Sequence, residues 1–426
     1  MHSFHEMGLD PFLLRSLDKM KLTQPTPIQA QTIPLSLDGK DVLGSAQTGT
    51  GKTLAFGIPL VSQLLKDQTS TALVLAPTRE LAQQVMHSIR QLTGNHPQLK
   101  MALLIGGESI VKQFKQLRVR PRIVVGTPGR VIDHLLRRSW DPETVKFLVL
   151  DETDRMLDMG FGIQLEEIIP KIPKDRQTLM FSATFPKNIL NLAGKYLRNP
   201  ERISIGSPDQ PAAKVKQEMI RVSEGQKYRA LLEQLSQREG SIIIFVKTKI
   251  GAERLAEKLN DEDHDALAIH GDLHQHKRER VIRAFRAGKQ RIMVATDVAA
   301  RGLDIPHIQH VINYDLPQCP EDYIHRIGRT ARAGAEGSAL CFVTPQEGGK
   351  WHAIHRFMNP TAPRENESHR SPKRPFSKSK RSGASSGSGA RGTNGKSEYS
   401  RSFKSDGGSA RKSRSRRSFS RETPRD

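Results

Sequence analysis

The chain has few cysteines, few aromatic residues and no long apolar run. Its 426 residues include two cysteines, Cys319 and Cys341, and 5% aromatic residues. Two cysteines cannot form a disulfide framework or supply a four-cysteine zinc site. No apolar run approaches the roughly 20 residues of a membrane-spanning helix, and residues 1–17 lack the apolar core of a signal peptide. We therefore expect a protein of a reducing, intracellular compartment, and place it in the cytoplasm.

Acidic residues are also in deficit. The chain has 67 Lys and Arg against 45 Asp and Glu, a formal net charge of +22. Residues 359–426 alone contain 18 basic residues, 6 acidic residues and 17 serines. Such a segment cannot bury enough apolar surface to offset its ordering entropy, so we predict a disordered Ser/Arg/Lys/Gly-rich tail. It is an arm that contacts nucleic acid, a solubilising segment or, in a eukaryote, an import signal.

The rest of the chain alternates short apolar runs with helical stretches. TALVLAP and KFLVLDE are typical of the runs, and RELAQQVMHSIRQL of the helical stretches. This alternation indicates parallel sheets buried on both faces by helices. It stops at GSPDQPAAKVK and then resumes. We predict an α/β fold with a first domain over residues 1–205, a linker over 206–216 and a second domain over 217–358.

Residues 46–53, AQTGTGKT, match the phosphate-loop pattern G-x-x-x-x-G-K-[ST], with alanine in its first position. The segment follows the apolar run DVLG and precedes a helical stretch. Its glycines allow the backbone amides to face phosphate oxygens at a helix N-terminus. Lys52 can reach the β- and γ-phosphates, and Thr53 can supply a hydroxyl to Mg²⁺. The predicted nucleotide-binding residues of the loop are Gly49, Thr50, Gly51, Lys52 and Thr53.

Two acidic residues directly follow the apolar run KFLVL. A phosphate loop requires a carboxylate at the end of a neighbouring strand. Asp151 is suited to hold Mg²⁺, partly through water, and Glu152 to orient or deprotonate the attacking water. Together with the phosphate loop, they predict a Mg²⁺-dependent nucleoside triphosphatase.

The order of the motifs resembles a known family. PTPIQ, AQTGTGKT, PTRELA, GG, TPGR, the acidic box, SAT, ATDVAARGLD and HRIGRTAR occur in the order found in the DEAD-box RNA helicases of superfamily 2. The resemblance covers residues 1–345, and the whole chain is most similar to the bacterial RhlE-type branch. It implies two tandem RecA-like domains, ATP and Mg²⁺ as cofactors, and RNA as the partner. Nothing in the sequence requires a dimer, so we expect a monomer.

The resemblance assigns adenine recognition to PTPIQ. Gln29 is chemically suited to this role because its amide can both donate to and accept from a base edge. By resemblance, Phe4 packs over the base, although ordinary core packing is the alternative. A glycine commonly opens this motif in the family, and here that position is Lys21.

The acidic box reads Asp-Glu-Thr-Asp rather than D-E-A-D. We expect the Thr153 hydroxyl, if buried, to need a partner such as a backbone carbonyl. ATPase activity should persist, while coupling of the box to the SAT segment is tuned. The residues that the resemblance implies for coupling are Asp154, Ser182, Thr184 and His325.

Members of the family hold single-stranded RNA by its phosphates and 2′-hydroxyls. Glycines permit close backbone approach, while Arg and Thr can contact phosphate. The matching positions that we predict to bind RNA are Arg79, Gly107, Thr127, Arg130, Arg278 and Thr296. Gln275 is similar to a further contact.

HRIGRTAR supplies the second half of the hydrolytic site by resemblance. Arg329 and Arg332 are spaced i, i+3, so on a helix they project from the same side. Both are implied to reach the γ-phosphate as arginine fingers when the domains close. Asp304 is similar to the ribose ligand of the family.

These features predict an RNA-stimulated ATPase that unwinds short duplexes non-processively or remodels RNA–protein complexes. RNA and ATP would close the second domain over the first and complete the site. Two alternatives remain open: an ATP-gated RNA clamp or annealing chaperone with little unwinding, and an enzyme that acts on DNA.

Overall fold

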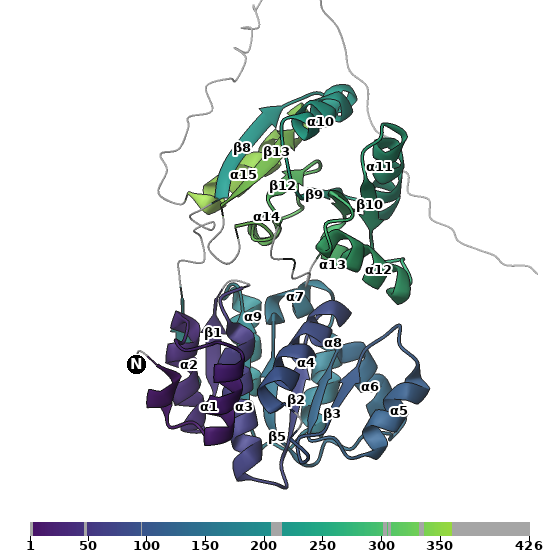
Figure 1. Cartoon of the computed structure of the whole chain (residues 1–426). Coiled ribbons are helices and arrows are strands. Elements are labelled where there is room, and N and C mark those ends of the chain that lie inside the picture. The colour runs from purple at the N-terminus through teal and green to yellow at the C-terminus, as the bar shows by residue number, and fades with distance from the viewer. Residues whose placement is uncertain are drawn as a thin grey trace, which may run out of the picture. The chain divides into compact units, whose positions relative to one another are not determined.

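A computed structural model of the chain describes residues 3–46, 49–94, 96–205, 215–300, 305, 308–331 and 336–359 (Figure 1). They form an N-terminal lobe, residues 3–205, and a C-terminal lobe, residues 215–359, within one compact unit. Most of the expected linker and all of the predicted tail after Asn359 lie outside the described residues. The first strand of the C-terminal lobe begins at Val215, inside the span expected to be linker.

The N-terminal lobe is built on a seven-stranded sheet in the order β3-β4-β2-β5-β6-β1-β7, in which all pairs are parallel. The central strands are buried on both faces, as the apolar runs predicted. The strands are β1 (Val42–Ser45), β2 (Thr71–Leu75), β3 (Met101–Leu104), β4 (Ile123–Gly126), β5 (Val145–Leu150), β6 (Gln177–Ser182) and β7 (Glu201–Ser204).

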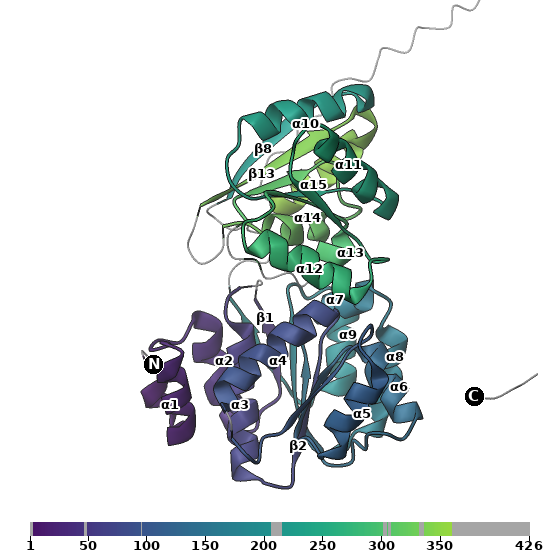
Figure 2. The same ribbon diagram turned by 45° about the vertical axis from the view of Figure 1, so that its right-hand side comes forward.

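Helices cover both faces of this sheet (Figure 2). One face packs against η1 (Phe4–Met7), α1 (Pro11–Lys19), α2 (Pro27–Leu37), α3 (Lys52–Lys66) and α4 (Arg79–Thr93). The other packs against α5 (Ile110–Arg118), α6 (Pro128–Leu136), α7 (Thr153–Asp158), α8 (Gly162–Ile168), η2 (Ile169–Lys171) and α9 (Lys187–Tyr196). Each face therefore has its own apolar core, and the sheet is a rigid base for the loops at its edge.

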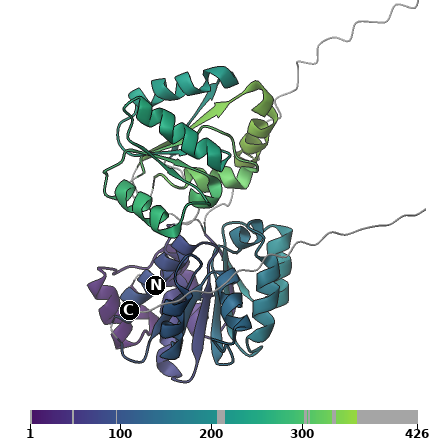
Figure 3. The same ribbon diagram turned by 90° about the vertical axis from the view of Figure 1, so that its right-hand side faces the viewer.

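The C-terminal lobe repeats this design with a six-stranded parallel sheet in the order β10-β11-β9-β12-β13-β8 (Figure 3). Its strands are β8 (Val215–Arg221), β9 (Ile242–Phe245), β10 (Ala266–Ile269), β11 (Ile292–Ala295), β12 (His310–Asn313) and β13 (Gly337–Val343). One face packs against α10 (Lys227–Ser236), which follows η3 (Glu224–Gln226), and against α11 (Lys249–Asp261). The other packs against α12 (Gln275–Arg286), α13 (Asp297–Ala300), α14 (Pro320–Ile327) and, after η5 (Pro345–Glu347), α15 (Gly348–Met358).

The prediction of two parallel α/β domains is thus confirmed. Because all strands of a sheet run the same way, the loops that follow them meet at one edge. In the N-terminal lobe these loops carry the phosphate loop after β1, the acidic box after β5 and the SAT segment at the end of β6. Among the described helices, none is long and apolar enough to cross a membrane.

Candidate nucleotide and nucleic-acid sites

The phosphate loop follows β1 and ends where α3 begins at Lys52. Gly49 and Gly51 have φ angles of +85° and +92°. Residues other than glycine rarely adopt such left-handed backbone angles. The Lys52 side chain is 7% exposed, and its Nζ donates to the carbonyl oxygen of Ala46 at 2.8 Å. Thr50 lies in the turn and Thr53 is the second residue of α3, so the predicted loop residues are gathered at one helix N-terminus.

Gln29 connects the PTPIQ segment to this loop. Its Oε1 accepts from the amide of Thr26 at 2.9 Å, and its Nε2 donates to the carbonyl of Gly51 at 3.0 Å. A Cβ at Gly51 would stand 2.4 Å from that Nε2, so a glycine is needed here for space as well as for conformation. Lys21, at the position where the family commonly has glycine, adopts a left-handed φ of +58°.

Phe4 is not brought to a surface beside Gln29. Its side chain is 1% exposed and packs in the core of the N-terminal lobe with residues of α1 and α2. This position fits the alternative of ordinary core packing, because almost no surface of the Phe4 ring is accessible to a base.

The acidic pair is buried where β5 ends. Asp151 is 2% exposed and its Oδ1 accepts from the amide of Glu152 at 3.0 Å. Burial raises the pKa of Asp151 to about 6, although the Lys52 ammonium opposes that rise. Burial would likewise raise the pKa of Glu152. The positive charges of Arg155, Lys52 and Arg329 outweigh burial, and they hold that pKa below its usual value.

Arg155 is a residue of this site that the sequence reasoning missed. Its side chain is 1% exposed, and its Nη1 lies 2.9 Å from Oε2 of Glu152. Glu152 has a left-handed φ of +50° and caps α7, so the two side chains meet across the first turn of that helix. The i, i+3 spacing of an acid and a base was the available signal. The ion pair fixes the direction of the Glu152 carboxylate.

The acidic box also contacts the SAT segment. Oδ2 of Asp154 accepts from the amide of Ala183 at 2.9 Å, and the Ser182 hydroxyl donates to the carbonyl of Thr184 at 2.7 Å. Thr153 is fully buried, and its hydroxyl donates to the carbonyl of Leu150 at 3.2 Å. The expected backbone partner for this hydroxyl is confirmed.

A cavity of about 500 Å³ collects several of the predicted RNA-binding residues. Its lining includes Arg79, Thr127, Arg130 and Arg278. Gly107 lies beside it, since a Cβ there would stand 2.5 Å from Nη1 of Arg79. Thr296 follows β11 and is 7% exposed, but it is not part of this lining.

Residues of both lobes meet in the wall of this cavity. Nε of Arg278 lies 2.8 Å from Oε1 of Glu80, and both side chains are less than a tenth exposed. Arg278 also donates to the carbonyls of His270 and Ala299. Nη1 of Arg79 donates to Oε1 of Gln275 at 3.3 Å. We predicted that the Arg278 guanidinium contacts RNA. In this structure it is bonded to Glu80 and to two backbone carbonyls.

A further hydrogen bond joins α4 and α12 nearby. Nε2 of Gln83 donates to Oε1 of Glu279 at 3.2 Å. Neither Glu80, Gln83 nor Glu279 was singled out from the sequence, because their partners lie about 200 positions away. Only the fold reveals these pairs.

The arginine segment follows α14. Arg329 is 3% exposed, its Nε donates to the carbonyl of His325, and its charge lowers the pKa of Glu152 in the other lobe. His325 lies in the last turn of α14 and is half-buried. The predicted residues Arg332 and Asp304 lie outside the described residues.

The donor atoms around the phosphate loop suit a hard cation. Asp151 offers a carboxylate and Thr53 a hydroxyl, both oxygen donors of the kind that Mg²⁺ prefers. Within the described ranges, no group of three or more His, Cys, Asp and Glu side chains gathers to hold a metal.

A phosphate loop, a buried acidic pair and a basic cavity between two α/β lobes define an ATPase of the nucleic-acid helicase class. A family model described as DEAD/DEAH box helicase matches residues 26–192, and one described as helicase conserved C-terminal domain matches residues 226–334. The chain belongs to the DEAD/DEAH box helicase family.

Relatives with curated names support this assignment. The "DEAD-box ATP-dependent RNA helicase CshA" of Geobacillus kaustophilus is 46% identical over 358 residues, covering 84% of this chain and 76% of that protein. The protein of the same name from Bacillus subtilis is 43% identical over 356 residues, covering 83% and 72%. A solved structure of S. cerevisiae Dbp5 bound to RNA and ADP BeF3 has a TM-score of 0.78 at 35% identity, covering 85% of this chain and 95% of that one. The prediction of two RecA-like domains is confirmed by this likeness.

Proposed function

We propose that this ATP-dependent DEAD-box RNA helicase opens short RNA duplexes locally, by closing its two lobes over RNA and ATP together, and that hydrolysis reopens them. The observation that carries the proposal is the buried ion pair between Glu80 and Arg278. It joins the lobes in the wall of the cavity that contains Arg79, Thr127 and Arg130. The residues that hold an RNA strand therefore lie beside the ion pair that holds the lobes together.

In this proposal the N-terminal lobe binds ATP. Lys52 and the amides of Gly49, Thr50 and Gly51 hold the phosphates, while Gln29 reads the adenine edge. Thr53 and Asp151 would hold Mg²⁺, which when bound neutralises charge on the β- and γ-phosphates. The burial of Phe4 argues against base packing by that ring and leaves Gln29 as the adenine contact.

Hydrolysis needs both lobes. Glu152 orients and deprotonates the attacking water, and Arg155 keeps its carboxylate charged and aimed. Arg329 and Arg332 stabilise the charge that develops on the transferred phosphoryl group, and Asp304 holds the ribose. The influence of the Arg329 charge on Glu152 supports this shared site.

RNA binding is linked to hydrolysis through short contacts at strand ends. Asp154 holds the SAT segment by its bond to Ala183, and His325 meets Ser182 and Thr184 from the other lobe when the cleft is closed. Gly107, Thr127, Arg130 and Thr296 contact the RNA backbone with Arg79. Arg278 affects RNA binding indirectly, because its ion pair with Glu80 stabilises the closed form.

The decisive experiment compares ATP hydrolysis with single-stranded RNA, with DNA of the same sequence and with no nucleic acid. RNA should stimulate hydrolysis far more than DNA. Equal stimulation by both would contradict RNA as the substrate. Strand separation is then measured on a short and a long duplex, of which only the short one should open if the enzyme is non-processive.

The basic tail favours a second candidate function, an ATP-gated RNA clamp or annealing chaperone. Residues 359–426 carry a net charge of +12, and Tyr and Phe side chains lie among the charges. Such a segment binds RNA through phosphate, with a strong dependence on salt. Strand separation and annealing should therefore be compared for the full chain and for a chain that ends at 358. The proposed helicase function predicts that truncation weakens RNA affinity and its salt dependence but leaves saturated ATPase intact.

We further propose that the protein acts as a monomer in the cytoplasm, where RNA and ATP occur together. Placement in the RhlE-type branch stays a prediction, because the curated relatives described above are named CshA.

A further inference from the structure

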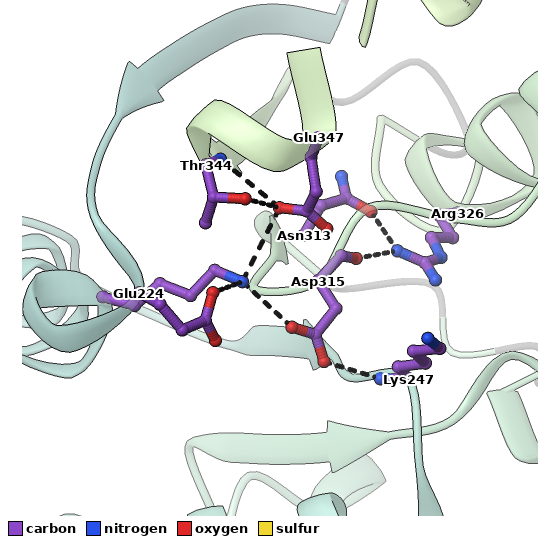
Figure 4. A network of polar contacts seen from close by, with 8 residues as sticks. Glu224, Lys247, Asn313, Asp315, Arg326, Thr344 and Glu347 are labelled. Atoms are coloured by element: carbon purple, nitrogen blue, oxygen red, sulfur yellow. Dashed lines mark hydrogen bonds and ion pairs between the residues drawn. The ribbon is translucent and has the colours of Figure 1, made fainter. Parts of the chain in front are cut away.

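A lysine is buried in the C-terminal lobe, where α10 begins, among three carboxylates. Lys227 is 1% exposed. Its Nζ lies 3.1 Å from Oδ1 of Asp315, 3.4 Å from Oε2 of Glu224 and 3.8 Å from Oε2 of Glu347. It also lies 5.3 Å from the centroid of the Tyr314 ring. One buried ammonium therefore balances three acids, and Figure 4 labels these acids.

The three acids come from three different chain connections. Glu224 belongs to η3, which leads from β8 into α10. Asp315 lies between β12 and α14, and Glu347 lies in η5, between β13 and α15. Glu347 is also bonded to the Thr344 hydroxyl at 3.0 Å. Lys227 thus joins the segments that follow strands β8, β12 and β13.

Asp315 connects these three segments to Arg326 in α14. Its Oδ2 accepts from the amide of Lys247 at 2.8 Å, which fixes its carboxylate on the side away from Lys227. Its backbone carbonyl accepts from Nη1 of Arg326 at 2.6 Å, and Asn313 accepts from the same nitrogen at 2.9 Å. Figure 4 shows these contacts of Asp315 with Lys247 and with Arg326.

Arg326 in turn anchors α14. It is 2% exposed and forms a two-point ion pair with Asp297, with distances of 2.6 and 2.7 Å. Its guanidinium stands 4.9 Å from the centroid of the Phe245 ring. The amide of Arg329 donates to the Arg326 carbonyl at 3.0 Å. The place of Arg329 therefore depends on where Arg326 is held.

We propose that Lys227 is a positioning residue for ATP hydrolysis: it holds Asp315, and through it Arg326, so that α14 presents Arg329 to the nucleotide. The inference rests on the proposed role of Arg329. Among the described residues, Lys227 has no ion pair or hydrogen bond with the phosphate loop or the acidic pair, so we expect it to act through this chain of contacts. Burial lowers the pKa of Lys227, but Asp315, Glu347 and Glu224 raise it above its ordinary value, so the ammonium is charged at neutral pH. Without it, three carboxylates would repel one another and displace Asp315.

The test begins with Lys227→Met in the full chain, assayed with saturating RNA well below its melting temperature. We expect kcat to fall about tenfold while KM for ATP stays unchanged, because the lysine orients a transition-state group and does not bind ATP. The control is Lys216→Met, which removes an exposed lysine of the same lobe that pairs with Glu218. A purely structural role would lower the melting temperature and leave kcat at wild-type level, and this result would overturn the inference.

A double-mutant cycle with Arg329→Ala separates this inference from the proposed function. If Lys227 acts through Arg329, then Lys227→Met causes little further loss of kcat once Arg329 is alanine. Full additivity of the two losses would overturn the inference. If Arg329→Ala alone leaves kcat unchanged, the assigned role of Arg329 fails first. If it lowers kcat while Lys227→Met does not, only the present inference fails.

Asp315→Asn is the second variant, for use if Lys227→Met does not fold. It keeps the backbone carbonyl that binds Arg326 but removes the negative charge that Lys227 needs, and it leaves one side-chain oxygen in place of the two that accept from Lys227 and from the Lys247 amide. The inference predicts the same loss of kcat at unchanged KM, and again no additivity with Arg329→Ala. A wild-type kcat in Asp315→Asn would contradict it.

Discussion

Glu80 and Arg278, 198 positions apart in the chain, form a buried ion pair of 2.8 Å that joins the two lobes. Glu80 directly follows Arg79 at the start of α4, and Arg278 lies in α12 after Gln275, which bonds to Arg79. Arg79, a predicted RNA contact in the cavity lining, is thus a sequence neighbour of a residue that joins the lobes. Because Glu80 lies in the first turn of α4, we expect any shift of this helix to change the geometry of the ion pair.

Removing one partner of this pair should weaken the closed form. Glu80→Gln or Arg278→Gln leaves a buried charge unpaired, at a cost of about 3–5 kcal/mol in that form. We expect RNA-stimulated kcat and RNA affinity with nucleotide present to fall at least tenfold, with little change in melting temperature. Fluorescence anisotropy and an ATPase assay measure these quantities.

The double variant is the control for this prediction. Because it removes both charges, its loss should be smaller than the sum of the single losses. Lys195→Met, which breaks an exposed pair with Glu166, should have no effect. Additive losses in the double variant would show that the pair is not a unit.

The next prediction concerns the buried pair of Glu152 and Arg155. Glu152→Gln should bind ATP and RNA yet turn over at least a hundredfold more slowly, since it loses the base for water. Arg155→Met should lower kcat about tenfold at unchanged nucleotide affinity, because the carboxylate stays but loses its direction. Wild-type turnover in Glu152→Gln would refute its assigned role. Arg137→Met, which breaks an exposed pair with Asp133, is the control for loss of an arginine.

Thr153 should be dispensable for hydrolysis. Thr153→Ala removes one buried hydrogen bond to Leu150 and should cost about 1 kcal/mol of unfolding free energy. ATPase should persist, with a changed ratio of RNA-stimulated to basal rate because Asp154 and the SAT segment follow directly. Chemical denaturation and the two ATPase rates test this. Complete loss of ATPase in a folded variant would show that the threonine has been misjudged.

Both cysteines should be unreactive in the native protein. Burial raises the pKa of Cys319 and of Cys341 to about 12. At pH 8 only about one thiol in ten thousand is then a thiolate, and the thiolate is the reactive form. Ellman's reagent should therefore react slowly up to about pH 10 and find two thiols after denaturation. Rapid reaction of either thiol at pH 8 would contradict these raised pKa values.

The parts of the site that are local in sequence could be predicted from it. The phosphate loop, Asp151, Glu152 and the alternation of strands and helices each depend on neighbouring residues, and all follow the predicted pattern. Pairs that depend on the fold could not be found in this way. Arg155 was not singled out, and Lys227 gains its carboxylates only when three connections meet. Arg278 was assigned to RNA by resemblance, and its partner Glu80 lies in the other lobe, far away in sequence. Phe4 was placed by resemblance, while local packing buries it.

The central claim is that RNA and ATP close the two lobes together, and one equilibrium measurement tests it most directly. The affinity of the full chain for single-stranded RNA is determined by fluorescence anisotropy with and without a non-hydrolysable ATP analogue. If both ligands favour the same closed form, the analogue tightens RNA binding at least tenfold, and RNA tightens analogue binding by the same factor. Glu80→Gln should abolish most of this coupling. Equal RNA affinity with and without the analogue in the wild-type protein would contradict the account.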